Sequence, residues 1–470
     1  MVKKEMKKSY KNESPWLYQL ASIRRPSDVL SKPVKSDITI IGAGIAGICT
    51  SYFLLRDTRK KVVLVEANKA ARGATGHNAG QIVSYFERPF SNIVKEYGLK
   101  VAAHGQEEVL SGWTLLEEIY AESKIQAPYS SFIGYAGCAT YEQVVQHLEN
   151  KNLRKKAKLK IDEVFVSENA PFLSKIPKKY KELYSIVPQS MILEFLETKD
   201  KQYYVALASK KGVLNSALFC EEILGYLLYK HKERFSLYEE TPIETVFLDK
   251  NNAKLVTKKD LIIETERVVL CTNGFEHINI VNNSGKDINK DFHETVMGYI
   301  GYMAGYLDKD IRKPVAISYL PEKDRKITPD NEKFEQPYFY LTRRNYSLDP
   351  KNPMMLICAG GPEAALDNEK DYIRDRPYFK KRQDEINSSL KRDYIYAPKG
   401  KIPYKFHWHG LMGYTKNGLR IIGPDKVNPV LLYNLGCNGI GILPSIYGGY
   451  KITRFIAGIK MPPSIFDPQI

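Results

Sequence analysis

The chain has 470 residues, of which 43% are hydrophobic and 26% are charged, and its formal net charge is +16. This is the composition of an ordinary globular protein, and the length allows two domains or one large composite. The six cysteines form no C-x-x-C pair, so we expect buried, reduced thiols and no metal site. The lysines are spread along the chain, and the densest basic run, residues 154–160, lacks aromatic neighbours, so we do not expect a nucleic-acid partner.

The N-terminal extension, residues 1–35, begins with a basic run at residues 1–8 that no apolar segment follows. A secretory signal requires such a segment, so we expect a cytoplasmic protein. Residues 38–55 are uncharged over the length of a short membrane helix, but three glycines interrupt them and a strand pattern follows. We therefore expect no transmembrane segment.

A strand and a glycine-rich turn follow this extension. The apolar residues 37–41 lead into Gly42-Ala43-Gly44-Ile45-Ala46-Gly47, and a second strand over residues 62–65 ends at Glu66. In a G-x-G-x-x-G turn the glycines permit the tight turn, the approach of a pyrophosphate and the close packing of the helix. Glu66 stands where a carboxylate binds a ribose hydroxyl, which argues against a 2′-phosphate. The pattern predicts a dinucleotide-binding βαβ unit with the phosphates at the helix N-terminus.

A helix and several strands are predicted in the middle of the chain. An apolar stripe predicts a helix over residues 214–229, capped by Asn215 or Ser216. Strand patterns occupy residues 235–238, 243–248, 254–257 and 261–264. The apolar residues 268–271 then break at Thr272-Asn273-Gly274, and we expect this strand to join the dinucleotide sheet.

Two regions differ from this pattern. Residues 101–205 are charged and mostly helical in pattern, and residues 281–402 contain aromatic, alternating segments that predict an antiparallel sheet. We assign both to a substrate domain inserted into the dinucleotide domain, which then consists of residues 36–100, 206–280 and 403–470. Its last segment reads as a strand, a glycine loop at residues 436–441 and a helix from residue 444.

Four separated motifs resemble those of the FAD-dependent amine and amino-acid oxidoreductases of the D-amino-acid oxidase (DAO) family, which includes glycine and sarcosine oxidases and γ-glutamylputrescine oxidase. They are residues 42–47, 72–82, 268–274, and 414–424 with the following glycine loop. The resemblance implies an α/β fold, α+β overall, in which a doubly wound, Rossmann-like FAD-binding domain is built from discontinuous segments and a mixed or antiparallel substrate domain is inserted.

The resemblance also selects FAD over NAD, because the family lays residues 73–80 against the flavin side of its cofactor. The expected FAD contacts are Gly42, Ala43, Gly44, Ile45, Ala46, Gly47, Glu66, Ala67, Arg72, Gly73, Ala74, Thr75, Gly76, His77, Asn78, Ala79, Gly80, Thr272, Asn273, Gly274, Asn438, Gly439, Ile440, Gly441 and Ile442.

His77 bears on how the flavin is attached. In the dimethylglycine and sarcosine dehydrogenase branch of the family, an aligned histidine is bonded covalently to the flavin, but Gly76 replaces the tryptophan that precedes it there. Covalent attachment is therefore an alternative, and we favour a histidine that only hydrogen-bonds in the cofactor cleft. The family's other linkage uses a cysteine ahead of a Tyr-Thr pair, and Met412 excludes it here.

Five residues are candidates for catalysis and substrate binding. Tyr340, Arg343 and Arg344 end an aromatic strand, and an arginine fork suits a carboxylate, with a solvated turn as the alternative. His409 and Tyr414 precede the FAD-contacting strand, where the family often places substrate-side groups, and a structural role is the alternative for His409.

These features predict an FAD-dependent oxidoreductase that takes a hydride from the CH–NH group of an amino acid, N-methyl amino acid or polyamine derivative, giving an imine that hydrolyses. Dioxygen or another electron acceptor would reoxidise the flavin. The alternatives are a flavoprotein acting on an aminomethyl base of tRNA, a non-catalytic flavin-binding subunit that needs a partner, and a dehydrogenase of C–OH donors.

Overall fold

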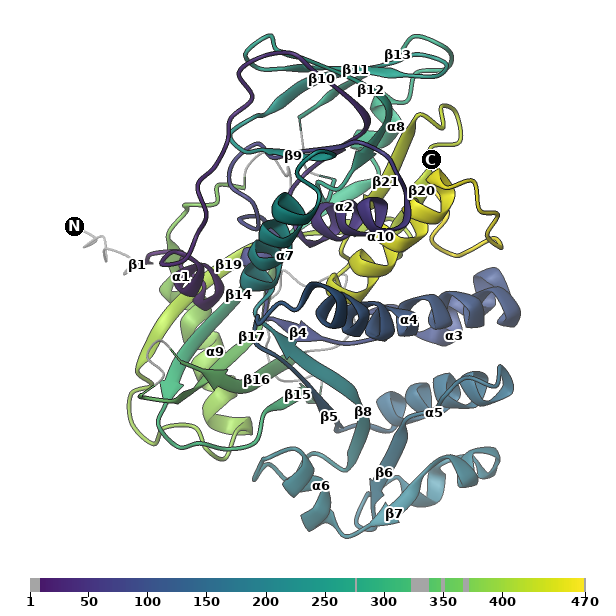
Figure 1. The fold of residues 1–470 in the computed structure, drawn as a ribbon. Helices are drawn as coiled ribbons and strands as arrows, with labels where there is room; N and C mark the ends of the chain where they lie inside the picture. The colour runs from purple at the N-terminus through teal and green to yellow at the C-terminus, as the bar shows by residue number, and fades with distance from the viewer. Residues whose placement is uncertain (1–8, 275–276, 323–337, 348–350, 367–371, 469–470) are drawn as a thin grey trace, which may run out of the picture.

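The computed structural model describes residues 9–274, 277–322, 338–347, 351–366 and 372–468. Two large β-sheets organise these residues, and helices pack around and between them (Figure 1). The basic run at residues 1–8 lies outside the described residues. Among the helices of these ranges, none combines the length and the hydrophobicity needed to span a bilayer.

The first sheet contains the glycine-rich turn. Its parallel core has the strand order β9-β3-β2-β12-β21, and the antiparallel strands β11 and β10 continue the sheet beyond β12. β12 thus joins the dinucleotide sheet as predicted, although it is one continuous strand where the sequence predicted two. The strands of this sheet are β2 (Val34–Ile41), β3 (Val62–Val65), β9 (Phe235–Tyr238), β10 (Ile243–Leu248), β11 (Ala253–Thr257), β12 (Ile262–Leu270), β13 (Asn279–Asn282), β20 (Ile421–Pro424) and β21 (Leu431–Leu435).

Helix α2 (Ile45–Asp57) explains the uncharged stretch of the sequence. It is buried from Ile45 to Leu55, packed against α7 (Ser216–Lys230) and α10 (Ile442–Ile456). A helix that is apolar all round belongs to a core as well as to a membrane, and here protein covers every face. The N-cap of α7 is Asn215, whose side chain accepts a hydrogen bond from the Leu218 N–H, as predicted.

The second sheet has the order β19-β14-β17-β16-β15-β5-β8-β6-β7, with β4 paired to β8. Its aromatic strands β14, β16 and β17 are antiparallel, as the alternating pattern predicted. The strands are β4 (Gln81–Ile82), β5 (Tyr129–Cys138), β6 (Glu163–Ser167), β7 (Ser185–Val187), β8 (Val205–Leu214), β14 (Val296–Asp308), β15 (Val315–Leu320), β16 (Phe339–Tyr346), β17 (Met354–Ala365) and β19 (Tyr404–Thr415).

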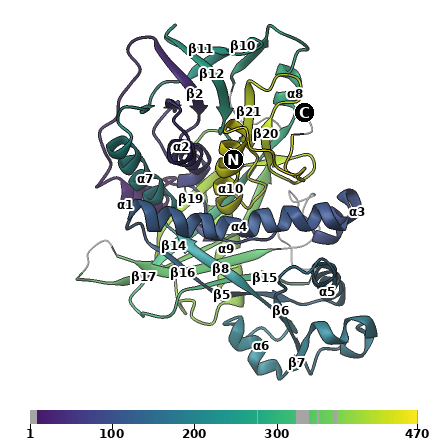
Figure 2. The same cartoon turned by 45° about the vertical axis from the view of Figure 1, so that its right-hand side comes forward.

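The remaining helices cover the sheets. Figure 2 shows α4 crossing between the first sheet above and the second sheet below. A short pair, β1 (Ser9–Tyr10) with β18 (Tyr378–Phe379), forms a separate ribbon. The helices that cover the sheets are α1 (Pro15–Leu20), α3 (Phe90–Tyr97), α4 (Leu99–Ser123), α5 (Tyr141–Lys156), α6 (Gln189–Phe195), α8 (Asn289–His293) and α9 (Lys380–Asp393). Short 3₁₀ turns lie at Ala74–Gly76, Leu173–Lys175 and Lys178–Leu183.

The sheets divide the chain differently from the predicted segments. The segments 206–280 and 403–470 were assigned to the dinucleotide domain, but they begin within β8 and with β19, which belong to the second sheet. β5 was also missed in a region predicted to be mostly helical. Its Gly134 lowers the strand propensity, and a Cβ there would lie 2.6 Å from the Ala316 carbonyl oxygen, so tertiary packing requires the glycine.

Candidate cofactor and active site

The turn between β2 and α2 has the geometry of a phosphate cradle. Gly42 has φ +102°, and a Cβ on Gly47 would lie 1.9 Å from the Gly42 carbonyl oxygen, so α2 approaches the turn too closely for any side chain. The N–H of Ile45, in the first turn of α2, donates to Thr75 Oγ1 at 3.0 Å. Gly44, Ile45 and Ala46 line the cavity described below, so the N-terminus of α2 lies at this cavity, which is the arrangement that binds a pyrophosphate.

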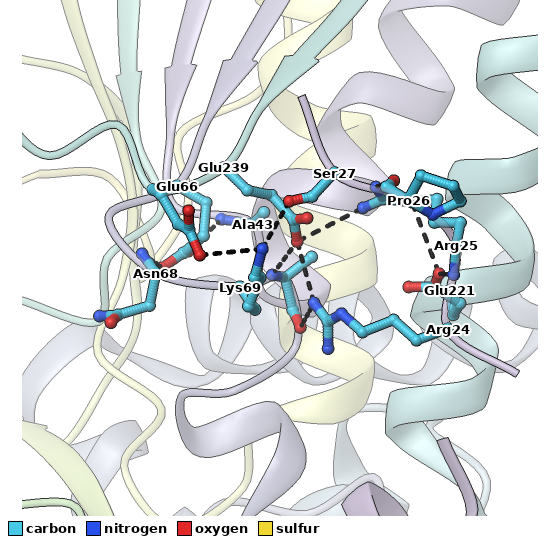
Figure 3. A network of polar contacts seen from close by, with 12 residues as sticks. Arg24, Arg25, Pro26, Ser27, Ala43, Glu66, Asn68, Lys69, Glu221 and Glu239 are labelled. Atoms are coloured by element: carbon cyan, nitrogen blue, oxygen red, sulfur yellow. Dashed lines mark hydrogen bonds and ion pairs between the residues drawn. The ribbon is translucent and has the colours of Figure 1, made fainter. Parts of the chain in front are cut away.

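Glu66 ends β3 beside this turn. Its carboxylate accepts hydrogen bonds from the N–H groups of Ala43 and Asn68, both at 2.9 Å, and burial raises its pKa. Figure 3 shows the polar network behind it, in which Glu239 accepts from Arg24 at 2.9 Å and from the Ala70 N–H. These contacts fix the backbone that follows Glu66, so that a carboxylate is held at the edge of the cavity for a ribose hydroxyl.

The segment of residues 73–80 is held rigidly from outside the cavity. The Asn78 side chain donates to the Thr75 carbonyl at 2.9 Å and to Ser216 Oγ at 3.0 Å. The Asn78 carbonyl accepts from the indoles of Trp16 at 2.7 Å and Trp408 at 3.2 Å. Because small residues fill the rest of this segment, its backbone forms a wall of the cavity that a planar ring can approach closely.

His77 lies on this wall as a neutral imidazole. Its Nδ1 lies 3.1 Å from the Gly73 carbonyl oxygen, and burial lowers its pKa to about 4. A cavity-lining histidine in this state matches the hydrogen-bonding alternative and leaves Nε2 as the atom for any covalent bond.

The last glycine loop closes the opposite side. Asn438, at φ +45°, accepts through its side-chain oxygen from the Thr415 N–H at 2.9 Å, and the Asn273 side chain accepts from the Cys437 N–H at 2.9 Å. A Cβ on Gly439 would lie 2.8 Å from Tyr414 Oη. The N–H groups of Asn438 and Ile440 donate within the protein, to the carbonyl oxygens of Gly413 and Cys437. The loop ends where α10 begins, and residues 439–442 line the cavity described below, so the N-terminus of α10 lies at this cavity.

These elements surround a cavity of about 1540 Å³. It extends from the glycine-rich turn and Glu66 to the second sheet, where Tyr340 and Tyr414 line it. All of the expected FAD contacts line the cavity except Ala43, Gly47, Gly76 and Gly274. Gly47 and Gly76 are needed for packing on the side away from the cavity. A Cβ on Gly76, for example, would lie 2.3 Å from the Ala71 carbonyl oxygen.

The structure places the arginine pair away from this cavity. The Arg343 guanidinium is paired with Glu197 at 2.5 and 2.7 Å and donates to Tyr394 Oη at 2.6 Å. Arg344 donates to the carbonyl oxygens of Ala79 at 2.7 Å and Gly80 at 3.0 Å. Both guanidinium groups are buried and neither lines the cavity, although Arg344 Nε has no hydrogen-bond partner among the described residues. The expectation that they bind a substrate carboxylate is therefore not supported.

His409 does not line the cavity either, although Tyr372, which contacts it, does. Its Nε2 lies 2.8 Å from the Arg376 carbonyl oxygen and its Nδ1 3.2 Å from Tyr372 Oη. This is the structural alternative that the sequence left open. Of the five candidates, only Tyr340 and Tyr414 line the cavity.

Sequence reasoning missed two carboxylates on the cavity wall. Glu87, in the loop between β4 and α3, and Glu363, on β17, both line the cavity, together with Tyr85 and Tyr338. Burial raises the pKa of Glu87 to about 7, and burial and then the charge of Glu87 raise that of Glu363 to about 8. The Gly360-Gly361-Pro362 sequence that interrupts an apolar strand was the one available signal for Glu363.

The residues present fit an FAD molecule. The cavity exceeds the roughly 300–1,000 Å³ of most small-molecule sites, as a dinucleotide together with a substrate requires. The turn at Gly42 would hold the phosphates of such a cofactor, and the Glu66 carboxylate would bind its ribose. The wall formed by residues 73–80 would lie against its ring system.

The fold and the cavity therefore define a dinucleotide-binding protein built around two large sheets. The model of the FAD dependent oxidoreductase family (DAO) matches residues 37–454, and the chain belongs to this family. The predicted family and FAD cofactor are thereby confirmed.

Three similar proteins illustrate the relationship. "Putative Rieske 2Fe-2S iron-sulfur protein YhfW" of Bacillus subtilis is 27% identical over 211 residues, 43% of this chain and 41% of that protein. Gamma-glutamylputrescine oxidoreductase of Escherichia coli is 29% identical over 114 residues, 24% of this chain and 26% of that protein. The chain thus matches less than half the length of either relative. The structure of glycine oxidase from Geobacillus kaustophilus has a TM-score of 0.62 at 13% identity, covers 92% of this chain and 98% of that one, and supports the fold.

Proposed function

We propose that this protein oxidises the CH–NH group of a small amine or amino acid. The observation that carries the proposal is the continuity of the cavity from the turn at Gly42 to Tyr340 and Tyr414, so that a bound donor can reach the cofactor. A nitrogen-bearing donor is supported by the names of similar proteins, which include a gamma-glutamylputrescine oxidoreductase and a glycine oxidase.

The chain's own residues would have three tasks in this reaction. FAD, when bound, accepts the hydride from the carbon next to the nitrogen. The N–H groups of Gly439 and Gly441 and the N-terminus of α10 would stabilise negative charge that develops on the cofactor, since the N–H groups of Asn438 and Ile440 donate to carbonyl oxygens of the protein. Tyr340 and Tyr414 would orient the donor, and the aromatic walls would exclude water. The released imine then hydrolyses to a carbonyl compound and ammonia, or an amine where the nitrogen is substituted.

The proposal is tested by anaerobic reduction of the purified flavoprotein, followed as the loss of visible flavin absorbance. Primary amines, N-methyl amino acids and amino acids are compared with 2-hydroxy acids and glycerol phosphate. We expect bleaching by members of the nitrogen-bearing group only. Bleaching by a C–OH donor alone, or FAD that no small donor reduces, would contradict the proposal, the second result favouring a flavin-binding subunit.

The electron acceptor is tested on the reduced protein. Mixing with dioxygen or with an artificial quinone acceptor separates oxidase from dehydrogenase behaviour. Hydrogen peroxide in one-to-one ratio with the carbonyl product would establish the oxidase reaction.

A further inference from the structure

The cavity is lined by basic residues such as Lys211, which donates to the Tyr135 carbonyl oxygen at 2.9 Å, as well as by acidic residues, and one part of its wall gathers carboxylates and tyrosines. Glu87 and Glu363 lie on it with Tyr85, Tyr338, Tyr340 and Tyr414. A single point, the Cβ position of Gly439, lies 2.8 Å from Tyr414 Oη and 3.1 Å from Glu87 Oε1, so these two groups converge there. Aromatic rings and carboxylates together are the surroundings that a cationic group prefers.

A β-bulge directs Glu363 into the cavity. Gly301 of β14 is paired with Glu363 and Met303 with Gly360, so β17 contains one extra residue between these pairs. Gly361, at φ +150°, lies in the bulge. Because side chains alternate along a strand, one extra residue moves Glu363 from the α9 side, where Ile357 packs, to the cavity side.

The two carboxylates have no counter-charge among the described residues. The Oε2 atom of Glu363 is buried and has no hydrogen-bond partner there. The neighbouring Arg88 is engaged by Glu96 and by the Asn417 carbonyl oxygen. No described cation lowers the pKa of either carboxyl, and an unpaired buried carboxyl of this kind costs free energy unless a ligand supplies the positive charge.

We infer that the substrate is a diamine-type molecule, whose second, non-reacting ammonium group is bound by Glu87 and Glu363 within the tyrosine wall. This inference rests on the proposed amine oxidation and narrows its substrate class. The reacting nitrogen must lose its proton before hydride transfer, whereas a carboxylate pair holds an amine protonated, so the pair suits the other nitrogen. A carboxylate at this end would face like charge, and Arg343 and Arg344 are not available to bind it.

The first test uses three amines that share a four-carbon chain and differ only in the group at the other end. Anaerobic flavin reduction is measured with 1,4-diaminobutane, butylamine and 4-aminobutanoate, and the chain is then varied from three to six carbons. We expect the best diamine to exceed the matched monoamine in kcat/KM by about 10- to 150-fold, as one charge-assisted contact provides, and the amino acid to be poorest. An amino acid equal to or better than the diamine overturns the inference.

The second test changes the carboxylates with nearly isosteric substitutions. Glu363→Gln and Glu87→Gln should each lower the diamine-to-monoamine ratio of kcat/KM by about 10-fold or more, whereas Glu244→Gln, at an exposed position on β10, should keep it. Thermal stabilisation by 1,4-diaminobutane should weaken in the same two variants, and the flavin spectrum verifies their folding. An unchanged ratio in both variants overturns the inference.

Different results would reject the diamine substrate class and the proposed amine oxidation. Reduction by amino acids with none by diamines rejects the diamine class and leaves amine oxidation standing. Reduction by C–OH donors alone rejects both.

Discussion

Arg344→Met separates a structural arginine from a substrate-binding one. The Arg344 side chain is buried, donates to the carbonyl oxygens of Ala79 and Gly80 and to Thr342 Oγ1 at 2.8 Å, and stacks on the Trp16 ring at 4.6 Å. Each buried carbonyl that loses its donor costs about 1–3 kcal/mol, so we expect the substitution to cost about 3–5 kcal/mol in total. The lost contacts position the segment of residues 73–80, and FAD retention should fall with stability.

The assay combines thermal unfolding with the ratio of flavin to protein absorbance. At about 2 °C per kcal/mol, the apparent midpoint of Arg344→Met should fall by at least about 6 °C, with less FAD bound after purification. Arg344→Lys should recover little, because an ammonium cannot reproduce the guanidinium fork. The matched control is Arg59→Met, at an exposed position between α2 and β3. A variant as stable and as yellow as that control, with a KM for a carboxylate substrate raised 100-fold, would refute the structural role.

Four further outcomes follow from the site. Gly47→Ala places a methyl group 1.9 Å from the Gly42 carbonyl oxygen, so fluorescence titration should show FAD binding weakened at least about 10-fold, and full occupancy would contradict the close approach. Glu66→Ala removes the acceptor of two N–H groups and a ribose partner and should weaken FAD binding by a similar factor; an unchanged Kd would remove the ribose role. Acid precipitation should release yellow FAD to the supernatant, because we favour a non-covalent His77, and colour in the pellet would establish the covalent alternative. Burial lowers the pKa of His77 and His407 to about 4, so between pH 6.5 and 4 the unfolded chain binds more protons at these two sites, and at pH 5 each histidine costs about 2 kcal/mol. The raised pKa values of Glu87 and Glu363 act in the opposite direction, so the test compares the unsubstituted protein with the double variant His77→Gln, His407→Gln. The midpoint of the variant relative to the unsubstituted protein should be higher at pH 5 than at pH 7, and an equal difference at the two pH values would contradict this.

The sequence predicted the nucleotide half of the site because its signals are local. The strand, turn and helix of residues 37–57 are contiguous, and Gly47 is required by the carbonyl oxygen of Gly42, five residues earlier. The same locality holds for the Asn215 cap of α7. Helix and strand periodicity also predicted β9, β10 and α7 closely. The strand β5 was not predicted, because its glycines are explained by packing against residues distant in the sequence.

The substrate half could not be predicted in the same way. Arg343 and Arg344 have the right composition for a carboxylate fork, but their partners, Glu197 and the carbonyl oxygens of residues 79 and 80, come from elements far away in the chain. No local pattern states that such partners exist, and they decide whether a cation is available to a ligand.

By itself, then, the sequence determined the phosphate-binding turn, since this turn depends on a backbone conformation that glycines and the adjoining strand and helix impose locally. The four motifs determined the family and, through that resemblance, the cofactor. Tertiary structure alone decided which charges face the cavity. One extra residue in β17 moves Glu363 to the cavity side, and the fold brings Glu87 to the loop at Gly439. A one-residue shift in a strand reverses every side chain beyond it, and the contacts that fix that shift lie on neighbouring strands.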